Sequence, residues 1–247
     1  IICHTVIGYG SELAGSHVSH GKAFSAEMVV KTKENLGVSF PPFEVPEEAY
    51  RAFKDTFVAR GKKAEEEDKK VLLNYKELHK EEYERFLDLK DNNVAPYLFA
   101  DGPKYEDGFK DATRNTPQAL LNIVAGQSSN LFGGSADVAD SVKTHVKSFT
   151  DYSKDNRKGE NINFGIREFA MGAIQNGILL HGGLRTYVGC FLVFADYRKP
   201  SIRRAARERI PAIYLFSHDS LAVGEDGPTH QPIEQLARLR AIPRLNL

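Results

Sequence analysis

Two histidines and three carboxylates lie close together in the segment SHDSLAVGEDGPTHQP, residues 217–232. Imidazole side chains can move protons because their unperturbed pKa lies near neutral pH. His218, Asp226 and His230 are therefore candidates for a site of chemistry. Residue types alone leave two other interpretations open, a surface loop with satisfied polar side chains and a metal site. The metal site is disfavoured because the segment has no His-x-x-x-His or comparable ligand pair.

Regular elements must hold this loop in place. An apolar run at 212–216 predicts a strand before it, and the pattern of 233–239 predicts a helix after it. The end of a strand is a usual location for functional residues in α/β proteins. Gly224 and Gly227-Pro228 favour turns. These turns allow side chains spread along the loop to converge without sharing one helix face.

Length and composition restrict the class of protein. A chain of 247 residues suits one large α/β domain or parts of two. Its 33 basic and 33 acidic residues balance, which argues against nucleic acid or an anionic membrane as a partner. No apolar run approaches the roughly 20 residues that span a bilayer. Cys3 and Cys190 are too few for a disulfide framework, which predicts a reducing, cytoplasmic location.

The N-terminal part combines short elements with a long charged stretch. Residues 1–10 lack the charged start of a signal peptide and predict a buried strand, so we expect the chain to begin inside a domain. Helices are predicted at 25–37 and 47–61, with Pro46 at the first turn. The charged segment 62–90 has helical periodicity and predicts a solvated helix. A polar linker is expected at 91–108.

A second domain is predicted to start near Thr113. Thr116 and Pro117 predict the N-cap and first residue of a helix at 118–124. The segment 132–137 predicts a strand end that turns on two glycines. A strand, a glycine turn and a helix are predicted around 162–168, with Glu168 in the first turn, where the helix dipole favours a carboxylate. The nearly uncharged stretch that follows, 169–183, predicts a buried helix.

Aromatic side chains recur every third residue after another predicted strand at 186–192. Phe191, Phe194 and Tyr197 fit either the core stripe of a helix or a wall that binds a flat heteroaromatic ring. The basic segment 198–209 is expected to be a solvated face, because the balanced net charge gives no support for RNA binding.

Several of these segments resemble the transketolase family. The stretch GEDGPTHQP, following a strand and His-Asp-Ser, resembles that family's signature loop. Further family-like segments occur in the same order along the chain: GSHVSHG at 15–21, ATR at 112–114, GGSAD at 133–137, GIREFAM at 165–171 and FLVFADY at 191–197. Two departures are Val138-Ala139-Asp140, where the family more often has Leu-Thr-Pro, and Phe169, where it often has His.

The resemblance implies a fold and a domain arrangement. It implies the thiamine diphosphate-binding α/β fold, with parallel sheets and helices on both faces, as two partial domains joined by a charged helical linker. Residues 1–61 would form the C-terminal part of the diphosphate-binding domain and residues 62–112 the linker. Residues 113–247 would form a pyrimidine-binding domain that is C-terminally incomplete.

The resemblance also implies an activity. Transketolases move a two-carbon ketol unit from a ketose phosphate to an aldose phosphate through the C2 carbanion of thiamine diphosphate, in the pentose phosphate pathway. The family's site lies between two subunits, which implies a homodimer. Its divalent metal, Mg²⁺ or Ca²⁺, is bound by a Gly-Asp-Gly motif that this sequence lacks. We therefore expect the metal ligands outside these residues, and no turnover by the chain alone.

The family's site residues map onto matching positions of this chain. Glu168 would hydrogen-bond the cofactor's N1′ and activate it. The other implied cofactor contacts are Asp137, Phe191, Phe194, Tyr197 and His20. The implied phosphate ligands are Arg114, Ser141 and His218, and the residues implied to contact sugar hydroxyls and move protons are Asp226, His230 and His20.

Two alternatives remain. One is a deoxyxylulose-phosphate synthase-like enzyme, against which the string EDGPTHQP at 225–232 argues. The other is a non-catalytic or split pairing subunit of a transketolase-like enzyme. The missing metal motif favours that subunit, and the presence of Glu168, Asp226 and His230 disfavours it.

Overall fold

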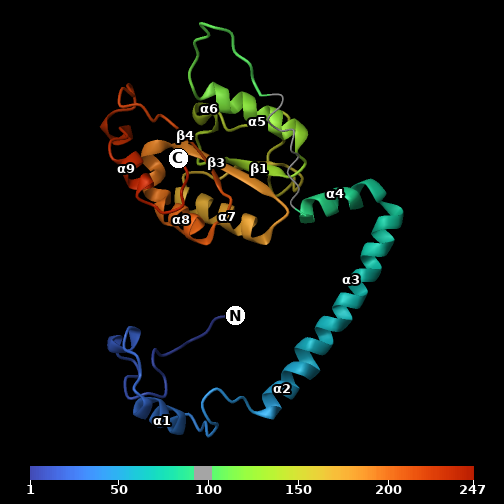
Figure 1. Ribbon diagram of the computed structural model, residues 1–247, viewed down its shortest axis with the longest axis vertical. Coiled ribbons are helices and arrows are strands. Elements are labelled where there is room, and N and C mark those ends of the chain that lie inside the picture. The colour runs from blue at the N-terminus through green and yellow to red at the C-terminus, as the bar shows by residue number, and fades with distance from the viewer. Residues whose placement is uncertain (92–101) are drawn as a thin grey trace. The chain divides into compact units, whose positions relative to one another are not determined.

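The computed structural model describes residues 1–91 and 102–247. The chain forms two compact units, Ile1–Asn74 (unit 1) and Tyr75–Leu247 (unit 2), which are described separately below (Figure 1). No helix in the described part of the chain is long and apolar enough to cross a membrane.

Unit 1 consists of helices and turns. Its elements are η1 (His17–His20), α1 (Ala26–Asn35), α2 (Glu47–Phe53), the π-helical η2 (Lys54–Val58) and most of α3 (Ala59–Leu78). The predicted helix at 25–37 is confirmed, because Ser25 caps α1 by accepting a hydrogen bond from the Met28 N–H at 3.2 Å. The predicted helix at 47–61 is also confirmed, and it continues without interruption into α3.

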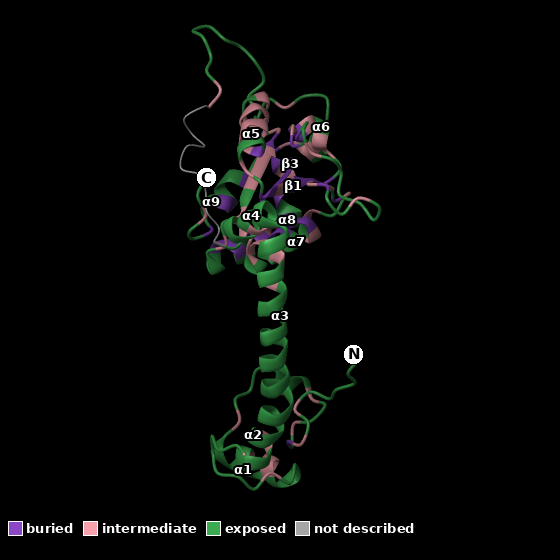
Figure 2. Ribbon diagram, turned by 90° about the vertical axis from the view of Figure 1, so that its right-hand side faces the viewer, coloured by how far each residue is buried: buried purple, intermediate pink, exposed green. Residues whose placement is uncertain are grey.

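The predicted strand at residues 1–10 is wrong. These residues are extended and then form turns in which Gly8 and Gly10 adopt positive φ angles of 66° and 83°. A strand needs a hydrogen-bonded neighbour, and residues 1–74 contain no strand with which it could pair. Ser11 is the one buried residue among residues 1–74. Figure 2 shows the helices of unit 1 mainly in the colour of exposed residues.

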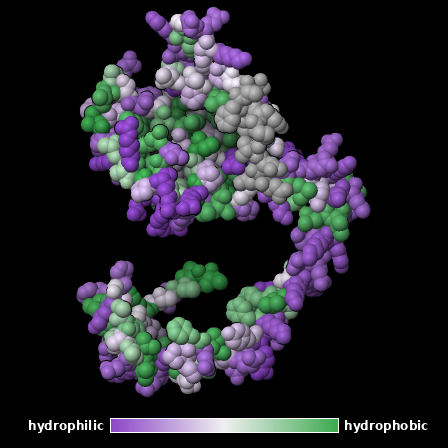
Figure 3. Space-filling model, in the orientation of Figure 1, coloured by the Kyte–Doolittle hydropathy of each residue, from purple (hydrophilic) through white to green (hydrophobic). Residues whose placement is uncertain are grey.

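The charged stretch forms two helices, α3 and α4 (Lys80–Asp91). Every residue of α3 is exposed or half-buried, which confirms the predicted solvated helix. Ion pairs within one turn, such as Lys69–Glu65 at 2.6 Å, decorate its surface, and Figure 3 shows it as mostly hydrophilic. Residues 92–101 of the predicted linker lie outside the described residues.

Unit 2 is built on a four-stranded parallel sheet. The strands are β1 (Leu131–Ser135), β2 (Asn161–Asn163), β3 (Arg185–Phe191) and β4 (Ile213–Ser217), in the order β2-β1-β3-β4. Gly133 pairs with Asn161 on one side and with Tyr187 on the other, and Tyr187 pairs with Ile213. The predicted α/β fold with a parallel sheet is therefore confirmed for this unit.

Helices cover both faces of the sheet (Figure 1). On one face, Leu121 and Ala125 of α5 (Asn115–Gln127) pack with Tyr187 of β3. On the other face, α7 (Glu168–His181) contributes Met171 to a cluster with Val188 and Cys190. The remaining elements are α6 (Ala139–Val142), η3 (Leu192–Phe194), α8 (Ala195–Glu208), η4 (Pro228–His230) and α9 (Gln235–Arg240).

Two predicted boundaries in unit 2 are wrong. Helix α5 begins at Asn115, so Thr116 and Pro117 lie inside its first turn and do not cap it. Gly133 and Gly134 lie within β1, whereas a turn was predicted there. A Cβ on Gly134 would come within 1.9 Å of the Ile162 carbonyl oxygen, so the close approach of β2 requires a glycine. The chain reverses later, at Asp137, which has a φ of 60°.

The nearly uncharged helix α7 is buried on one face only. Met171, Gly172 and Gln175 are buried against the sheet and α8. The opposite face exposes Phe169 and Leu180 to 55% and 62%, so the prediction of a fully buried helix is wrong. Hydropathy alone does not distinguish burial in a core from an apolar face left open at the surface.

Candidate functional site

The candidate residues of unit 2 gather at one edge of the sheet. Parallel strands bring their carboxyl ends to the same edge, which is the usual ligand-binding edge of open α/β sheets. Asp137 and Ser141 follow β1, Glu168 follows β2, the aromatic row follows β3, and the segment 217–232 begins at the end of β4. The topology thus joins segments that are separated by up to about a hundred residues of sequence.

An aromatic row follows β3. The rings of Phe191 and Phe194 lie 6.0 Å apart between centroids with 19° between their planes, and Phe194 and Tyr197 lie 6.1 Å apart at 29°. Phe191 is buried, whereas Tyr197 is 66% exposed, so the row runs from the core to the surface. The buried Phe191 agrees with the core interpretation, although it lies in β3 and not in a helix, and the ring-binding wall stays a prediction.

Two histidines from the loop after β4 extend this row. The His218 ring stacks on Phe191 at 3.7 Å between centroids, with 26° between the planes. His230 meets Phe194 edge-on at 5.1 Å and 81°. The structure therefore brings together His218, His230 and the aromatic row (Phe191, Phe194 and Tyr197), which the sequence presented as separate motifs.

His218 is held by contacts on both ring nitrogens. Its Nδ1 lies 2.9 Å from the Ser217 hydroxyl, and its Nε2 lies 3.9 Å from the Asp226 carboxylate. Its backbone has a φ of 53°, an uncommon conformation for a non-glycine residue and one that is found at functional sites. Ser217 was missed by the sequence analysis, although its position next to a candidate histidine was a usable signal.

The electrostatics around His218 favour a neutral ring. Partial burial lowers its pKa below the ordinary value of 6.5, and Asp226 opposes this shift. The Arg114 charge and the neighbouring His230 lower the pKa of His218 further, while Asp219 raises it. A neutral imidazole at neutral pH can donate one hydrogen bond and accept another.

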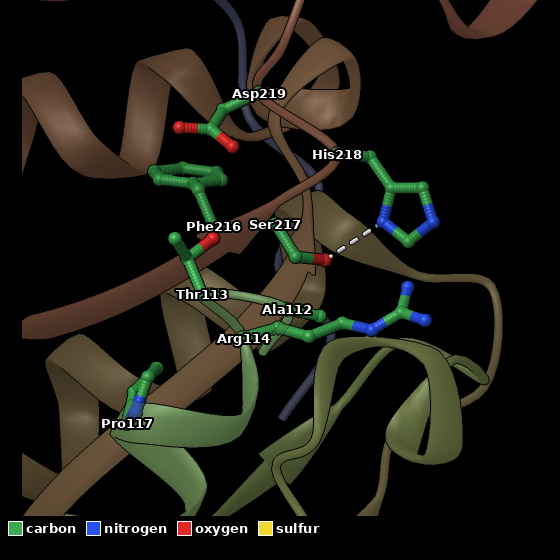
Figure 4. A pocket seen from close by; sticks show the side chains of 8 residues that line it. All are labelled: Ala112, Thr113, Arg114, Pro117, Phe216, Ser217, His218 and Asp219. Carbon is green, nitrogen blue, oxygen red and sulfur yellow. Dashed lines mark hydrogen bonds between the residues drawn. The ribbon is translucent and has the colours of Figure 1, made fainter. Parts of the chain in front are cut away.

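A pocket of about 400 Å³ opens beside His218 (Figure 4). The start of α5 supplies Arg114, and the end of β4 supplies Ser217 and His218. In the close-up, the Arg114 side chain extends below the His218 ring on the same side of the pocket. The other lining residues are Ala112, Thr113, Pro117, Phe216 and Asp219. A guanidinium and an imidazole that line one pocket can both donate hydrogen bonds to an anion.

Glu168 occupies the first residue of α7, as predicted. The preceding turn depends on Gly165, whose φ is 67°, and the Arg167 side chain secures it by donating to the Phe164 carbonyl at 2.9 Å. Glu168 is half-buried and follows β2 at this edge of the sheet.

Arg198 is the largest departure from the sequence analysis, which placed it on a solvated face. Its side chain is fully buried in α8, and its guanidinium lies over the rings of Tyr214 and Phe216 at 5.1 and 4.7 Å. Its three guanidinium nitrogens have no hydrogen-bond partner among the described residues. Burial lowers the pKa of Arg198, and the neighbouring groups Cys190, Tyr214 and Glu168 oppose that shift.

Burial also shifts two groups beside Arg198. It raises the pKa of the Cys190 thiol to about 11 and that of the Tyr214 hydroxyl to about 12, although the Arg198 charge opposes both shifts. Both groups are therefore neutral at physiological pH. Sequence reasoning missed this trio because a basic helix carries no signal that one of its arginines points inward.

The other candidates are less enclosed. Asp137 is exposed just after β1, and Ser141 is half-buried in α6. His20 is exposed in η1 of unit 1. Across residues 1–91 and 102–247, no group of three or more His, Cys, Asp or Glu side chains is placed to hold a metal ion.

Comparison with protein families decides the relationship. Residues 110–247 match the family model described as the transketolase pyrimidine binding domain, and residues 1–95 match the transketolase thiamine diphosphate binding domain. The chain belongs to the transketolase family. The two matches leave residues 96–109 between them.

Individual transketolases agree with this assignment. The chain is 48% identical to a probable transketolase of Streptococcus pneumoniae and 43% identical to a transketolase of Geobacillus stearothermophilus, each over 98% of this chain. A crystal structure of the Pichia stipitis transketolase complex with sedoheptulose-7-phosphate matches with a TM-score of 0.87 and 32% identity. It covers 96% of this chain and 36% of that one.

The similarity covers only part of these transketolases. The chain spans 37% of the length of both curated relatives named above. The activity of a whole transketolase is therefore taken up below as a proposal.

Proposed function

We propose that the protein to which these residues belong is a transketolase, a transferase that moves a two-carbon ketol unit from a ketose phosphate to an aldose phosphate in the pentose phosphate pathway. The observation that carries the proposal is the convergence of the aromatic row, the pocket of Arg114 and His218, and Glu168 at one sheet edge. Each component suits one part of such a reaction.

The residues present fit thiamine diphosphate. A flat heteroaromatic ring binds well to aromatic faces, which the row of Phe191, Phe194 and Tyr197 offers as it runs outward from the core. Asp137 leaves the neighbouring strand at the same edge. When bound, the cofactor supplies a carbanion nucleophile and an electron sink. Family membership supports this assignment, since the matching models are named for the cofactor's diphosphate and pyrimidine parts.

Glu168 is proposed to hold a proton at the ring nitrogen N1′ of the cofactor. Glu168 is the first residue of α7, directly after the turn at Gly165, so it lies at the same sheet edge as the aromatic row. A carboxyl group in this role performs general acid–base work at an atom remote from the reacting carbon.

The pocket beside His218 is proposed to bind the sugar phosphate. Arg114 would supply a fork of donors to phosphate oxygens, and Ser141 would add a hydroxyl. Asp226, His230 and His20 are proposed to contact the sugar hydroxyls and move protons. Structures of the Pichia stipitis enzyme carry sedoheptulose-7-phosphate, fructose-6-phosphate and xylulose-5-phosphate in their names, which supports ketose phosphates as the substrate class.

A homodimer with the site between subunits is also proposed. The apolar face of α7 supports it, because Phe169, Ile174 and Leu180 are exposed to 47–62%, and Ile166 just before the helix to 79%. Such a patch marks an interaction surface.

Mg²⁺ or Ca²⁺ would be bound by ligands outside these residues. The proposed domain boundaries are a diphosphate-binding part at 1–61, a linker at 62–112 and a pyrimidine-binding domain at 113–247. A cytoplasmic location is also proposed, and the two free cysteines agree with it.

Calorimetry with thiamine diphosphate and magnesium tests the proposal. We expect no binding to the 247-residue chain alone. Binding and ketol transfer are expected from the protein as its source makes it, with whatever sequence precedes or follows these residues. Glu168→Gln should lower the transfer rate at least about 100-fold, whereas Glu82→Gln, an exposed residue of α4, should leave it unchanged. Absence of binding in both samples would favour a non-catalytic pairing subunit.

A further inference from the structure

One carboxylate links the aromatic row to the far end of the loop that carries His230. Asp196, in the first turn of α8, follows Phe194 by two residues. Its carboxylate oxygens accept from the Arg238 Nη1, at 3.2 Å to each, and one of them accepts from the Gln235 Nε2 at 3.2 Å. Both donors belong to α9, so three hydrogen bonds cross from one helix to the other.

The link is partly shielded from water. Gln235 is buried with 3% of its surface exposed, and the side chains of Asp196 and Arg238 are 38% and 47% exposed. The Arg238 Nη2 also lies 3.2 Å from Glu234, which orients the guanidinium. A carboxylate that receives an arginine at both oxygens and a buried amide as well is more restrained than an isolated surface pair.

The loop from His218 to Pro232 depends on its two ends for its position. Its first end leaves β4, which is hydrogen-bonded into the sheet. Its second end enters α9, which the Asp196 link and the burial of Leu239 hold against α8. Between these ends most residues are exposed, although Pro232 is buried and the Gln231 Nε2 donates to the Val223 carbonyl. His230 precedes Gln235 by only five residues, so the position of the start of α9 restricts where His230 can lie.

We propose that Asp196 is a positioning residue, which fixes the start of α9 and thereby holds His230 against Phe191 and Phe194. The placement of the loop by Asp196 does not depend on the proposed function. The expected effect on turnover does rest on it, because His230 is treated there as a residue of the sugar site.

The expected consequence is a loss of apparent substrate affinity. If the link is removed, the loop spends part of its time with His230 displaced, and only the remaining fraction binds substrate. The apparent dissociation constant rises by the inverse of that fraction. At saturating substrate the bound form selects the placed loop, so kcat changes much less than KM.

Two variants and one control test this role in the protein as its source makes it. Asp196→Ala removes all three hydrogen bonds, whereas Arg238→Met removes only the arginine contacts. Arg204→Met is the matched control, because Arg204 pairs with Glu208 within α8 and does not reach α9. Asp196→Asn keeps an acceptor for Gln235, so it should disturb the loop less than Asp196→Ala does.

Amide hydrogen exchange gives the first readout. Asp196→Ala should speed exchange within 219–235 by about 5- to 30-fold, Arg238→Met by less, and neither should speed exchange in β1 or β3. The second readout is kinetic: KM for the ketose phosphate should rise by a similar factor, with kcat within about threefold. A uniform rise in exchange throughout unit 2 would show a merely structural role and would overturn the proposal.

The two proposals can fail separately. If the unmodified protein shows no ketol transfer, the proposed function fails, and the exchange data alone decide whether Asp196 holds the loop. If the unmodified protein is active and Asp196→Ala behaves like Arg204→Met in both readouts, the role of Asp196 is refuted and the proposed function stands. The Asp196→Ala and Arg238→Met effects should also combine less than additively, since they share contacts.

Discussion

Units 1 and 2 both carry histidines from family-like motifs, yet they hold them in different ways. In unit 2, His218 and His230 lean on a buried phenylalanine beside a four-stranded sheet. In unit 1, His20 lies exposed in a single turn of 3₁₀-helix, in a unit with one buried residue. A motif thus identifies the residue types of a site, whereas a packed sheet is needed to fix the positions of those residues relative to one another.

The sharpest test of this contrast replaces one glycine in each unit. Gly134→Ala should destabilise unit 2 by about 3 kcal/mol or more, because the new Cβ meets the backbone of β2, which cannot move aside. Gly61→Ala, in α3 with nothing near its Cβ position, should stabilise its helix by about 0.5–1 kcal/mol. Urea unfolding followed by circular dichroism measures both. Equal, small effects would contradict the packing described for β1 and β2.

The two cysteines report on the same contrast without any substitution. Cys3 is exposed in unit 1, and Cys190 is buried in β3 with its pKa raised to about 11 by burial. Because the thiolate is the reactive form, iodoacetamide at pH 8 should modify Cys3 about a thousandfold faster than Cys190. Peptide mass spectrometry over time measures the ratio. Comparable rates would mean that unit 2 opens far more often than its core implies, and urea should abolish the difference.

Truncating one apolar side chain in each unit should give a smaller difference. Met171→Ala removes a fully buried side chain from the cluster between α7 and the sheet, and should cost about 2–5 kcal/mol. Val71 lies in α3 and is 64% exposed, so Val71→Ala should change stability by less than about 0.5 kcal/mol. The midpoints of urea denaturation compare them. A loss for Val71→Ala as large as for Met171→Ala would show that α3 is buried against something else.

The finest prediction concerns the titration of His218. Because burial lowers its pKa, the folded state favours the neutral ring, and the unfolded state binds more protons just below pH 6.5. Its contribution to stability is therefore complete above about pH 6.5 and is lost as the pH falls. In an NMR titration, Arg114→Met should move the His218 midpoint up and Asp226→Asn should move it down. Arg204→Met, which removes a charge paired with Glu208 within α8, should leave it unchanged. Shifts of the opposite sign would contradict the placement of these charges.

Sequence patterns predicted some local features around the candidate site correctly, whereas the site residues themselves stay a prediction. The apolar run before Ser217, the Gly165 turn and the spacing of Phe191 and Phe194 each depend on local sequence, and each prediction agrees with the structure. Local signals are enough there because a strand end, a positive φ at glycine and a helical period are properties of a few consecutive residues.

The failures arose where a distant neighbour decides. Gly134 needs to be glycine because of Ile162, which is 28 residues away, so a turn was the natural but wrong interpretation. Arg198 is buried because Tyr214 and Phe216 offer it two ring faces, which no pattern within the basic segment reveals. The strand predicted at residues 1–10 lacks a pairing partner in unit 1. Which sites converge could be predicted for unit 2 only from the assumption of a parallel sheet.

The buried guanidinium of Arg198 affects how the stability of unit 2 depends on temperature. Removing a charge from water is costly, and two aromatic faces offset only part of that cost. The hydration of charged groups carries a strongly negative entropy, so the penalty for keeping them dry falls as the temperature rises. The buried charge of Arg198 therefore destabilises unit 2 most at low temperature and least at high temperature. As a result, the free energy of unfolding of unit 2 falls less steeply on heating.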